Sequence, residues 1–428
     1  MKRRTLIASG SAVGVSMMLS ACGSGSSSSG SSQIRFINAN VGYNSLAFAV
    51  DTSATTAPVA YGSVSGYGSY NSGTVTMVTS DGSSGTLVTS TSRLINKGVN
   101  YTFVAYGSSR AVKLMQLSDD EVAAATGYTK LRVLNLAADS GALAVYLTTE
   151  TADLASSTPT FATVGGDSAS GYISVPSASY RVRVTAAGDP TDVRFDASGI
   201  SLSSTGVVAL ALTPGPSGVL VQGILVVQGS TVTPLPNRQS RVRVVASVAD
   251  NAVVNASVGS TLLLDNVRSP AIGIYATVTA GSLPLSITVN GKAVATPNLA
   301  AVAGTDYTLL VTGPSSAPSV VVLTEDNRLP LVASNCRVRL VHAASGLSTS
   351  GLTLTVNYAA LAQDVKFGTS STYTEVAAGT NMLIDVANPL AVASAANFSG
   401  VTLLSGGLYT VFVVMGTNGP AGILRKER

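Results

Sequence analysis

Ile34-Arg35-Phe36-Ile37-Asn38 is the first copy of a short stretch that the chain repeats four times. The later copies open with Leu131-Arg132-Val133-Leu134, Val242-Arg243-Val244-Val245 and Val338-Arg339-Leu340-Val341. Each copy sets an arginine among apolar residues, and the arginines follow one another at intervals of 97, 111 and 96 residues. Repeats of about 100 residues match the usual size of a folded domain, so the sequence predicts four domains in tandem.

The composition indicates an all-β protein. Apolar residues make up 46% of the 428 residues and charged residues only 11%, which is too apolar for a disordered chain. Valine and threonine favour strands, and the many glycine and serine residues suit tight turns between them. The first repeat reads as roughly seven short strands with frequent turn signals, which is typical of a β-sandwich.

Two further marks recur at fixed places in the repeats. A Gly-x-x-Tyr-Thr run precedes a late apolar strand in the first, third and fourth repeats, whereas the second repeat has Thr205-Gly206-Val207-Val208 there. Every repeat also has a tyrosine six residues before a small residue, and we expect a strand to begin at the tyrosine. These tyrosines are Tyr67, Tyr172, Tyr275 and Tyr373. Shared marks of this kind predict that the repeats fold alike.

The repeated arginines are interpreted as structural. In a strand whose side chains alternate, Arg35 faces away from Phe36, which we expect on the core side. We therefore expect outward arginines that pair across a strand or pack their stems on a neighbouring domain, in preference to a ligand role. The sequence offers them no consistent polar partner.

The N-terminus predicts a lipid anchor. Residues 1–22 resemble a bacterial lipoprotein signal peptide, with a basic start, a short apolar segment and the lipobox Leu19-Ser20-Ala21-Cys22. We expect lipidation of Cys22, followed by a flexible Gly/Ser tether over residues 23–32. The predicted location is the cell envelope, and the outer membrane if the organism is Gram-negative. Export by the general or by the twin-arginine route stays open.

Charge gives no support to nucleic-acid binding. The formal net charge is +4, but Lys2, Arg3 and Arg4 lie in the predicted signal peptide, which has no acid. Its removal leaves 22 basic and 21 acidic residues. Because no stretch gathers lysine and arginine with interleaved aromatic residues, we expect no nucleic-acid partner.

No catalytic or metal-binding constellation is visible. His342 is the only histidine, lies in a strand, and is interpreted as structural. Cys336 would be alone once Cys22 is lipidated, so a buried filler is favoured over a reactive thiol. We predict no enzyme, no cofactor and no metal site, including no tight calcium site at the acidic clusters around Asp119–Glu121 and Glu325–Asp326.

Two tyrosines are weak candidates for ligand contact. Tyr43 and Tyr70 lie outside the repeated positions of the first repeat, and exposed aromatic rings can stack on sugars. Tyr61 and Tyr67 are interpreted as structural. Tyr43 and Tyr70 therefore keep a glycan-binding alternative open.

The opening strand, the run Tyr61–Tyr67 and the Gly-x-x-Tyr-Thr strand resemble the bacterial domain-of-unknown-function 4397 family. The resemblance covers about residues 33–423 and is best in the first two repeats. It implies immunoglobulin-like β-sandwiches in cell-envelope proteins, often lipoproteins, and it implies no reaction. We therefore expect four tandem sandwich domains: 33–128, 129–238, 239–334 and 335–428. The expected function is a non-enzymatic structural or protein-interaction module; the alternative is a glycan- or polymer-binding protein that supports a partner enzyme.

Overall fold

The computed structural model describes residues 30–51, 53–54, 57–108 and 111–428. The predicted signal peptide, Cys22 and most of the predicted tether lie outside these residues. The described chain is all-β, as predicted, with two 3₁₀ turns, η1 (Ala138–Ser140) and η2 (Ser345–Leu347). Its helices include none that is long and apolar enough to cross a membrane. The first strand begins at Ser31, so Ser31 and Ser32 of the predicted tether belong to a strand.

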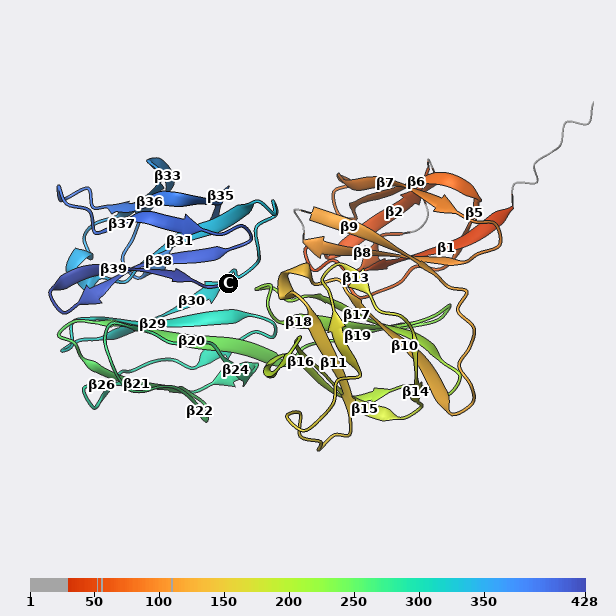
Figure 1. Ribbon diagram of the computed structural model, residues 1–428, viewed down its shortest axis with the longest axis horizontal. Coiled ribbons are helices and arrows are strands. Elements are labelled where there is room, and N and C mark those ends of the chain that lie inside the picture. Colours follow the sequence, from red (N-terminus) through yellow and green to blue (C-terminus); the bar gives the residue numbers. More distant parts are fainter. Residues whose placement is uncertain (1–29, 52, 55–56, 109–110) are drawn as a thin grey trace, which may run out of the picture.

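The strands form four consecutive sets, which we call units 1 to 4 (Figure 1). Unit 1 holds β1 (Ser31–Asn38), β2 (Ser45–Val50), β3 (Ser53–Ala54), β4 (Val59–Ala60), β5 (Gly68–Asn71), β6 (Gly73–Asp81), β7 (Leu87–Ile95), β8 (Tyr101–Ser108) and β9 (Ala111–Ser118). Unit 2 holds β10 (Tyr128–Asn135), β11 (Leu143–Thr148), β12 (Phe161–Val164), β13 (Ser168–Ala169), β14 (Ile173–Pro176), β15 (Ser179–Ala186), β16 (Asp189–Ser201), β17 (Val207–Pro214), β18 (Val221–Val227) and β19 (Val232–Leu235).

Units 3 and 4 repeat this order. Unit 3 holds β20 (Gln239–Val248), β21 (Val253–Val258), β22 (Thr261–Arg268), β23 (Ala271–Ile272), β24 (Ala276–Thr279), β25 (Gly281–Leu283), β26 (Leu285–Val289), β27 (Lys292–Ala293), β28 (Leu299–Ala301), β29 (Asp306–Gly313) and β30 (Ser319–Glu325). Unit 4 holds β31 (Asn335–His342), β32 (Leu352–Val356), β33 (Ala359–Val365), β34 (Thr369–Ser370), β35 (Thr374–Ala377), β36 (Gly379–Ala387), β37 (Ala396–Leu403), β38 (Leu408–Gly416) and β39 (Gly419–Lys426).

The repeated opening strand holds the same place in every unit. It is an inner strand of one sheet and runs parallel to the late apolar strand, which carries the Tyr-Thr pair of the Gly-x-x-Tyr-Thr mark in units 1, 3 and 4. The parallel pairs are β1 with β8, β10 with β17, β20 with β29, and β31 with β38. Each of the four repeated tyrosines lies one residue before a strand that pairs antiparallel with the opening strand. These strands are β5, β14, β24 and β35.

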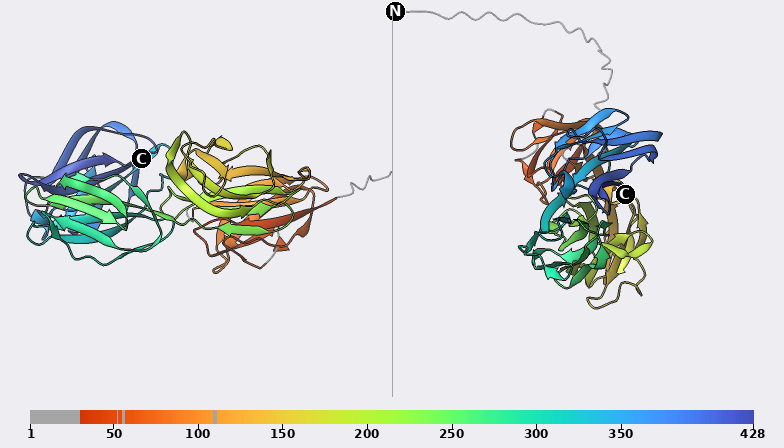
Figure 2. Two further views of the ribbon diagram at one scale, coloured as in Figure 1. Left: turned by 90° about the horizontal axis from the view of Figure 1, so that it is seen from below. Right: turned by 90° about the vertical axis from the view of Figure 1, so that its left-hand side faces the viewer.

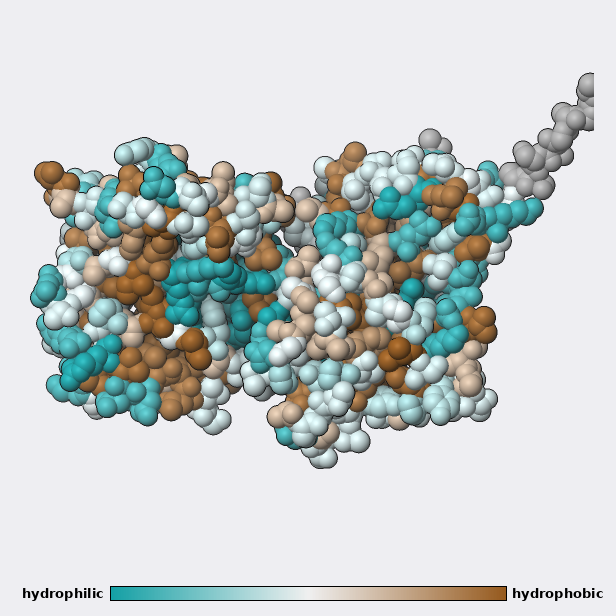
Figure 3. Space-filling view, viewed as in Figure 1, coloured by the Kyte–Doolittle hydropathy of each residue, from teal (hydrophilic) through white to brown (hydrophobic). Residues whose placement is uncertain are grey.

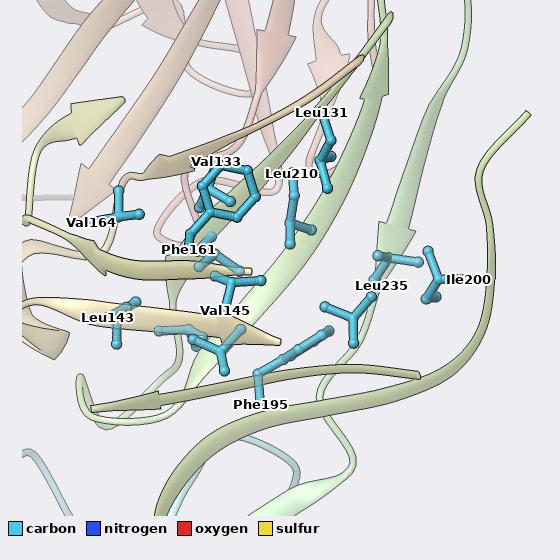
Figure 4. Packing of buried hydrophobic residues seen from close by; sticks show 14 of the residues in the cluster. Leu131, Val133, Leu143, Val145, Phe161, Val164, Phe195, Ile200, Leu210 and Leu235 are labelled. Atoms are coloured by element: carbon cyan, nitrogen blue, oxygen red, sulfur yellow. The ribbon is translucent and has the colours of Figure 1, made fainter. Parts of the chain in front are cut away.

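Each unit has its own apolar core between its two sheets. In unit 2, Val133 of the opening strand lies in one apolar cluster with Val145 and Phe195 of the opposite sheet (Figure 4). Phe36, Val244 and Leu340 are the corresponding inward residues elsewhere, and all of them are fully buried. The alternation expected from the sequence is thus correct for the core side of the strand.

The units also pack in two pairs, unit 1 on unit 2 and unit 3 on unit 4 (Figures 1 and 2). Apolar residues two positions after the repeated arginines, on the same face, are buried between the units of a pair. They are Ile37 and Leu134 in one pair and Val245 and Val341 in the other. The opening strand is therefore buried on both faces, which explains its nearly continuous apolar pattern.

Candidate functional site

The repeated arginines form a buried layer between paired units. Arg35, Arg243 and Arg339 are only 2%, 0% and 2% exposed. Their whole guanidinium groups are buried, where the sequence predicted outward arginines with packed stems. A buried cation is costly unless hydrogen bonds and opposite charge compensate it, so its partners decide what this layer can do.

Each of these three arginines has the same kinds of polar partner. The parallel register sets the arginine opposite the threonine of the Gly-x-x-Tyr-Thr mark. Nε donates to that threonine at 2.8, 2.9 and 3.2 Å in units 1, 3 and 4. The repeated tyrosine stacks on the guanidinium, with its ring centre 5.1, 4.6 and 4.5 Å from the central carbon in Arg35, Arg243 and Arg339. The expectation that the arginines lack a consistent polar partner is therefore wrong.

An acid at the end of the last strand completes the set. Asp119, Glu325 and Glu427 each follow the residue that pairs with the late-strand tyrosine. In unit 1, Asp119 lies 3.7 Å from Arg35 and accepts hydrogen bonds from Tyr67 (2.7 Å) and Thr102 (2.5 Å). Asp119 and Glu325 belong to the clusters considered above for calcium, and all three acids are partners of buried arginines.

Units 3 and 4 exchange their acids. Arg243 of unit 3 donates two hydrogen bonds to Glu427 of unit 4, at 2.7 and 2.9 Å. Arg339 of unit 4 forms an ion pair with Glu325 of unit 3, which also lies 3.8 Å from Arg243. The two arginines and two carboxylates balance in charge. Each unit therefore compensates the buried cation of the other.

The electrostatics of this exchange can be read from its titrating groups. Burial alone would raise the pKa of Glu427, but Arg243, Arg339 and Arg425 together lower it below its ordinary value. Burial raises the pKa of Tyr275, and Glu325 adds to that effect. Burial likewise raises the pKa of Tyr373 to about 12. The tyrosines therefore stay neutral while the carboxylate stays charged, as a closed ion-pair layer requires.

The pair of units 1 and 2 is built differently. Arg35 reaches across to main-chain carbonyls of unit 2, those of Ser230 (2.6 Å) and Val227 (3.1 Å). Unit 2 lacks the threonine, because Ala209 lies opposite Arg132, and it has Gln228 at the place of the acid. Arg132 still stacks on Tyr172 at 4.6 Å, but within the described residues its buried Nε has no hydrogen-bond partner. The departure seen in the second repeat therefore coincides with an incomplete arginine site.

A polar junction joins the two pairs. Ser217 of unit 2, 1% exposed, donates to the carbonyl of Glu325 at 2.6 Å and accepts from the amide of Asp306 at 2.9 Å. Gly218 beside it has a φ of +86°, and a Cβ there would lie 2.6 Å from the Arg328 side chain. Glycine is thus required both by conformation and by close approach. Together these contacts fix unit 2 against unit 3.

The cleft beside this junction offers no catalytic arrangement. A cavity of about 160 Å³ is lined by residues of units 1, 2 and 4 and by the segment 328–331. Its charged groups are engaged with one another or with the main chain: Lys113 pairs with Asp167, and Arg337 donates to Asp326 at 3.0 Å. Within the described ranges, there is no group of three or more histidine, cysteine, aspartate or glutamate side chains that could hold a metal ion.

The remaining sequence candidates lie in ordinary structural surroundings. His342 is fully buried, its Nε2 lies 3.2 Å from the carbonyl of Leu347, and burial lowers its pKa. Cys336 is fully buried in the core of unit 4, and burial raises its pKa to about 11. A neutral buried imidazole and a buried thiol have no access to a substrate.

Tyr43 and Tyr70 both pack against the core of unit 1 and remain half-buried. Tyr43 lies in the turn between β1 and β2, and Tyr70 lies on β5. Cys22, the predicted lipidation site, is outside the described residues. The buried acid–arginine layer was missed from the sequence, although the apolar residue two places after each arginine already indicates a covered face.

Two stretches of the chain, residues 32–146 and 240–349, match the model of a family described as a domain of unknown function (DUF4397). Together they make up more than half of the chain. The second stretch spans the third repeat, where the resemblance seemed weaker than in the second. Each match continues past one unit and through the opening strand of the next. No curated protein sequence is significantly similar.

Two solved structures have a partial likeness to this chain. One is a candidate cell adhesion protein from Bacteroides uniformis ATCC 8492, with 13% identity and a TM-score of 0.22, covering 47% of this chain and 98% of its own. Another is a family-26 carbohydrate-binding module from Eubacterium rectale Amy13K in complex with maltoheptaose, with 12% identity and a TM-score of 0.15, covering 47% and 96%. At these TM-scores neither likeness bears on function.

Proposed function

Because the chain belongs to the DUF4397 family of domains of unknown function, we propose that it is a non-enzymatic cell-envelope lipoprotein. In this proposal it acts as a surface-exposed structural or protein-interaction module. One observation carries the proposal: the repeated polar and aromatic residues are used inside the molecule, to join units. Repeated residues that served a reaction would instead converge on an open cleft with unengaged acid, base or nucleophile groups.

The contacts between units support a stiff body. Apolar side chains and buried ion pairs join unit 3 to unit 4, and hydrogen bonds from Ser217 join unit 2 to unit 3. A chain of linked but independent domains would bend at every linker, whereas an interface of this kind resists bending. A stiff body is suited to holding a surface at a set distance from a membrane anchor.

Crosslinking of intact cells tests the interaction module. We expect the chain to be recovered with one or more envelope proteins, through crosslinks on exposed lysines such as Lys366, whose side chain is 65% exposed. An excess of the purified chain added before crosslinking should compete the product away. Recovery without any crosslinked partner would leave only the structural role, and hydrolytic activity of the purified chain would contradict the proposal.

The anchor is proposed at Cys22. Cells fed a fatty-acid probe should label the wild-type protein and should not label a Cys22→Ala variant, because a thioether-linked lipid needs that sulfur. Cys336→Ala is the matched control: it removes the only other cysteine, which is fully buried, and should keep the label. Label retained in Cys22→Ala would contradict lipidation at this residue.

Glycan binding is the second candidate function, favoured only by the partly exposed rings of Tyr43 and Tyr70. If it is correct, a glycan array should reveal a ligand whose binding falls about tenfold, or about 1.4 kcal/mol, in Tyr43→Ala or Tyr70→Ala, because each variant removes a ring on which a sugar would stack. Tyr358→Ala, at an 86% exposed tyrosine of unit 4, is the control. If all three variants bound the glycan as well as the wild type, Tyr43 and Tyr70 would not belong to the binding site.

A further inference from the structure

A second cavity lies where units 2, 3 and 4 meet, beside the end of β39. Its volume is about 190 Å³, well above the roughly 10–15 Å³ that a single water needs. Three arginines from three different units line it: Arg194, Arg241 and Arg428. The other lining residues are Asp192, Val219, Tyr275, Asn327 and Glu427. The cavity wall is therefore more polar than apolar and rich in guanidinium groups.

The acids around this cavity already have partners. Asp192 accepts from Arg194 at 2.6 and 3.2 Å. Glu427 is held by Arg243 of the buried layer, and Arg241 donates two hydrogen bonds to Asp306 at 2.8 and 2.5 Å. Each of these carboxylates is thus neutralised by an arginine other than Arg428.

Arg428 has no carboxylate partner within the described chain. Its guanidinium donates to the main-chain carbonyls of Asn327, at 3.0 Å, and of Asp139. Burial, and then the positive charge of Arg194, lowers the pKa of Arg428 to about 10, although the nearby carboxylate of Asp139 opposes this effect. The guanidinium of Arg428 is thus held by main-chain dipoles, and no carboxylate of the described chain accepts a hydrogen bond from it.

Donors remain for a ligand. Nη1 of Arg241 and Nε of Arg428 make no hydrogen bond to any described residue. The side chains of Arg194 and Arg241 are 13% and 14% exposed, so solvent reaches the cavity. Hydrophilic side chains gather on the face of the molecule around the C-terminus (Figures 1 and 3). Planar guanidinium groups suit oxyanions, which accept several hydrogen bonds at once.

We propose that this cavity binds a small oxyanion, such as a phosphate group, between Arg194, Arg241 and Arg428. The ligand would neutralise Arg428 and join three units through one ion. The same chemistry is offered by free phosphate and by a phosphate ester on an envelope polymer. The site lies beside the buried arginine layer, whose Tyr275 and Glu427 also line the cavity. Of the site's three arginines, Arg194 and Arg241 already pair with a carboxylate, and Arg428 donates only to main-chain carbonyls within the described chain.

Calorimetric titration of the purified chain with inorganic phosphate, in a chloride buffer near neutral pH, tests the proposal. We expect saturable one-to-one binding and a melting temperature that rises with phosphate concentration, because the ligand binds only the folded state. Arg428→Gln and Arg194→Gln should each weaken binding at least about tenfold, since each removes charged hydrogen bonds. Glucose 1-phosphate in a parallel titration distinguishes an ester-borne phosphate from the free ion.

Arg268→Gln is the matched control, because Arg268 is exposed in unit 3 and carries the same charge. It should bind phosphate within about twofold of the wild type. The two cavity variants are independent, so a fold defect in Arg428→Gln, seen as a lower melting temperature without phosphate, leaves Arg194→Gln to decide. The proposal fails if the wild type shows no saturable binding, or if the cavity variants bind as well as Arg268→Gln.

Discussion

Replacing Arg243 by methionine should lower the free energy of unfolding by about 3–5 kcal/mol, the usual cost of breaking a buried ion pair. Methionine fills much of the same space, so the loss reports charge more than volume. The reason is that Glu427, whose side chain is 3% exposed, would stay buried without its two hydrogen bonds. Urea unfolding followed by circular dichroism measures the change.

The double variant Arg243→Met with Glu427→Gln is the control for this interpretation. Removing both charges should recover a large part of the loss, because an uncharged pair carries no desolvation penalty for an unpaired ion. Exposed Arg268→Gln should change stability by less than about 0.5 kcal/mol. A double variant no more stable than Arg243→Met would mean that packing, and not charge, explains the effect.

Lowering the pH should reduce the difference in the free energy of unfolding between the wild type and Arg243→Met, both measured by urea unfolding. The folded-state pKa of Glu427 lies below its unfolded value, so the ion pair stabilises the wild type above the unfolded pKa of about 4.3. That stability is lost as the pH falls through the folded pKa. The charged and titrating groups that face Glu427 are Arg243, Arg339, Arg425, Tyr275 and Tyr373. In Arg243→Met the carboxyl group of Glu427 should protonate more easily. Protonation removes the buried charge that lacks its arginine partner, so the variant should regain part of its lost stability.

The repeated stretch predicted the class of fold because it carries two kinds of local information. Strand alternation placed Phe36 and its counterparts on the core side, and the structure has them there. The arginine was correctly placed on the opposite face and expected to pair across a strand, as it does with a threonine. That face was taken to point outward, however, whereas the neighbouring unit buries it. Ile37 and its counterparts are apolar on the same face as the arginine, and an apolar residue beside a charge on one face indicates a covered surface.

The partners of the arginines could not be predicted from the sequence for a physical reason. Arg243 and Glu427 are separated by 184 residues, and their contact depends on how two units dock. Strand periodicity and turn residues describe each unit alone and contain no information on docking. The threonine partner could have been predicted, because Arg35 and Thr102 each belong to a repeated motif. Parallel pairing of β1 with β8 sets these two residues side by side.

Replacing Phe412 by alanine should also destabilise the protein by about 3–5 kcal/mol, through the cavity left behind. Phe412 is fully buried between units 3 and 4, where it packs with Val245, Leu310 and Val341. Its ring also lies 5.6 Å from the guanidinium carbon of Arg243, so its loss would weaken the shielding of the ion pairs from water. The free energy of unfolding in urea and the rate of amide hydrogen exchange measure the effect.

Phe412→Leu is the matched control, because Leu310 holds the corresponding place in unit 3. Leucine keeps most of the apolar volume, so the variant should lose clearly less stability than Phe412→Ala. In Phe412→Ala, exchange should accelerate in β20 and β29 of unit 3 as well as in β31 and β38 of unit 4, because both opening strands lean on the same interface. Faster exchange confined to unit 4 would mean that the two units are stable independently, and that the exchanged acids join domains which do not need each other to fold.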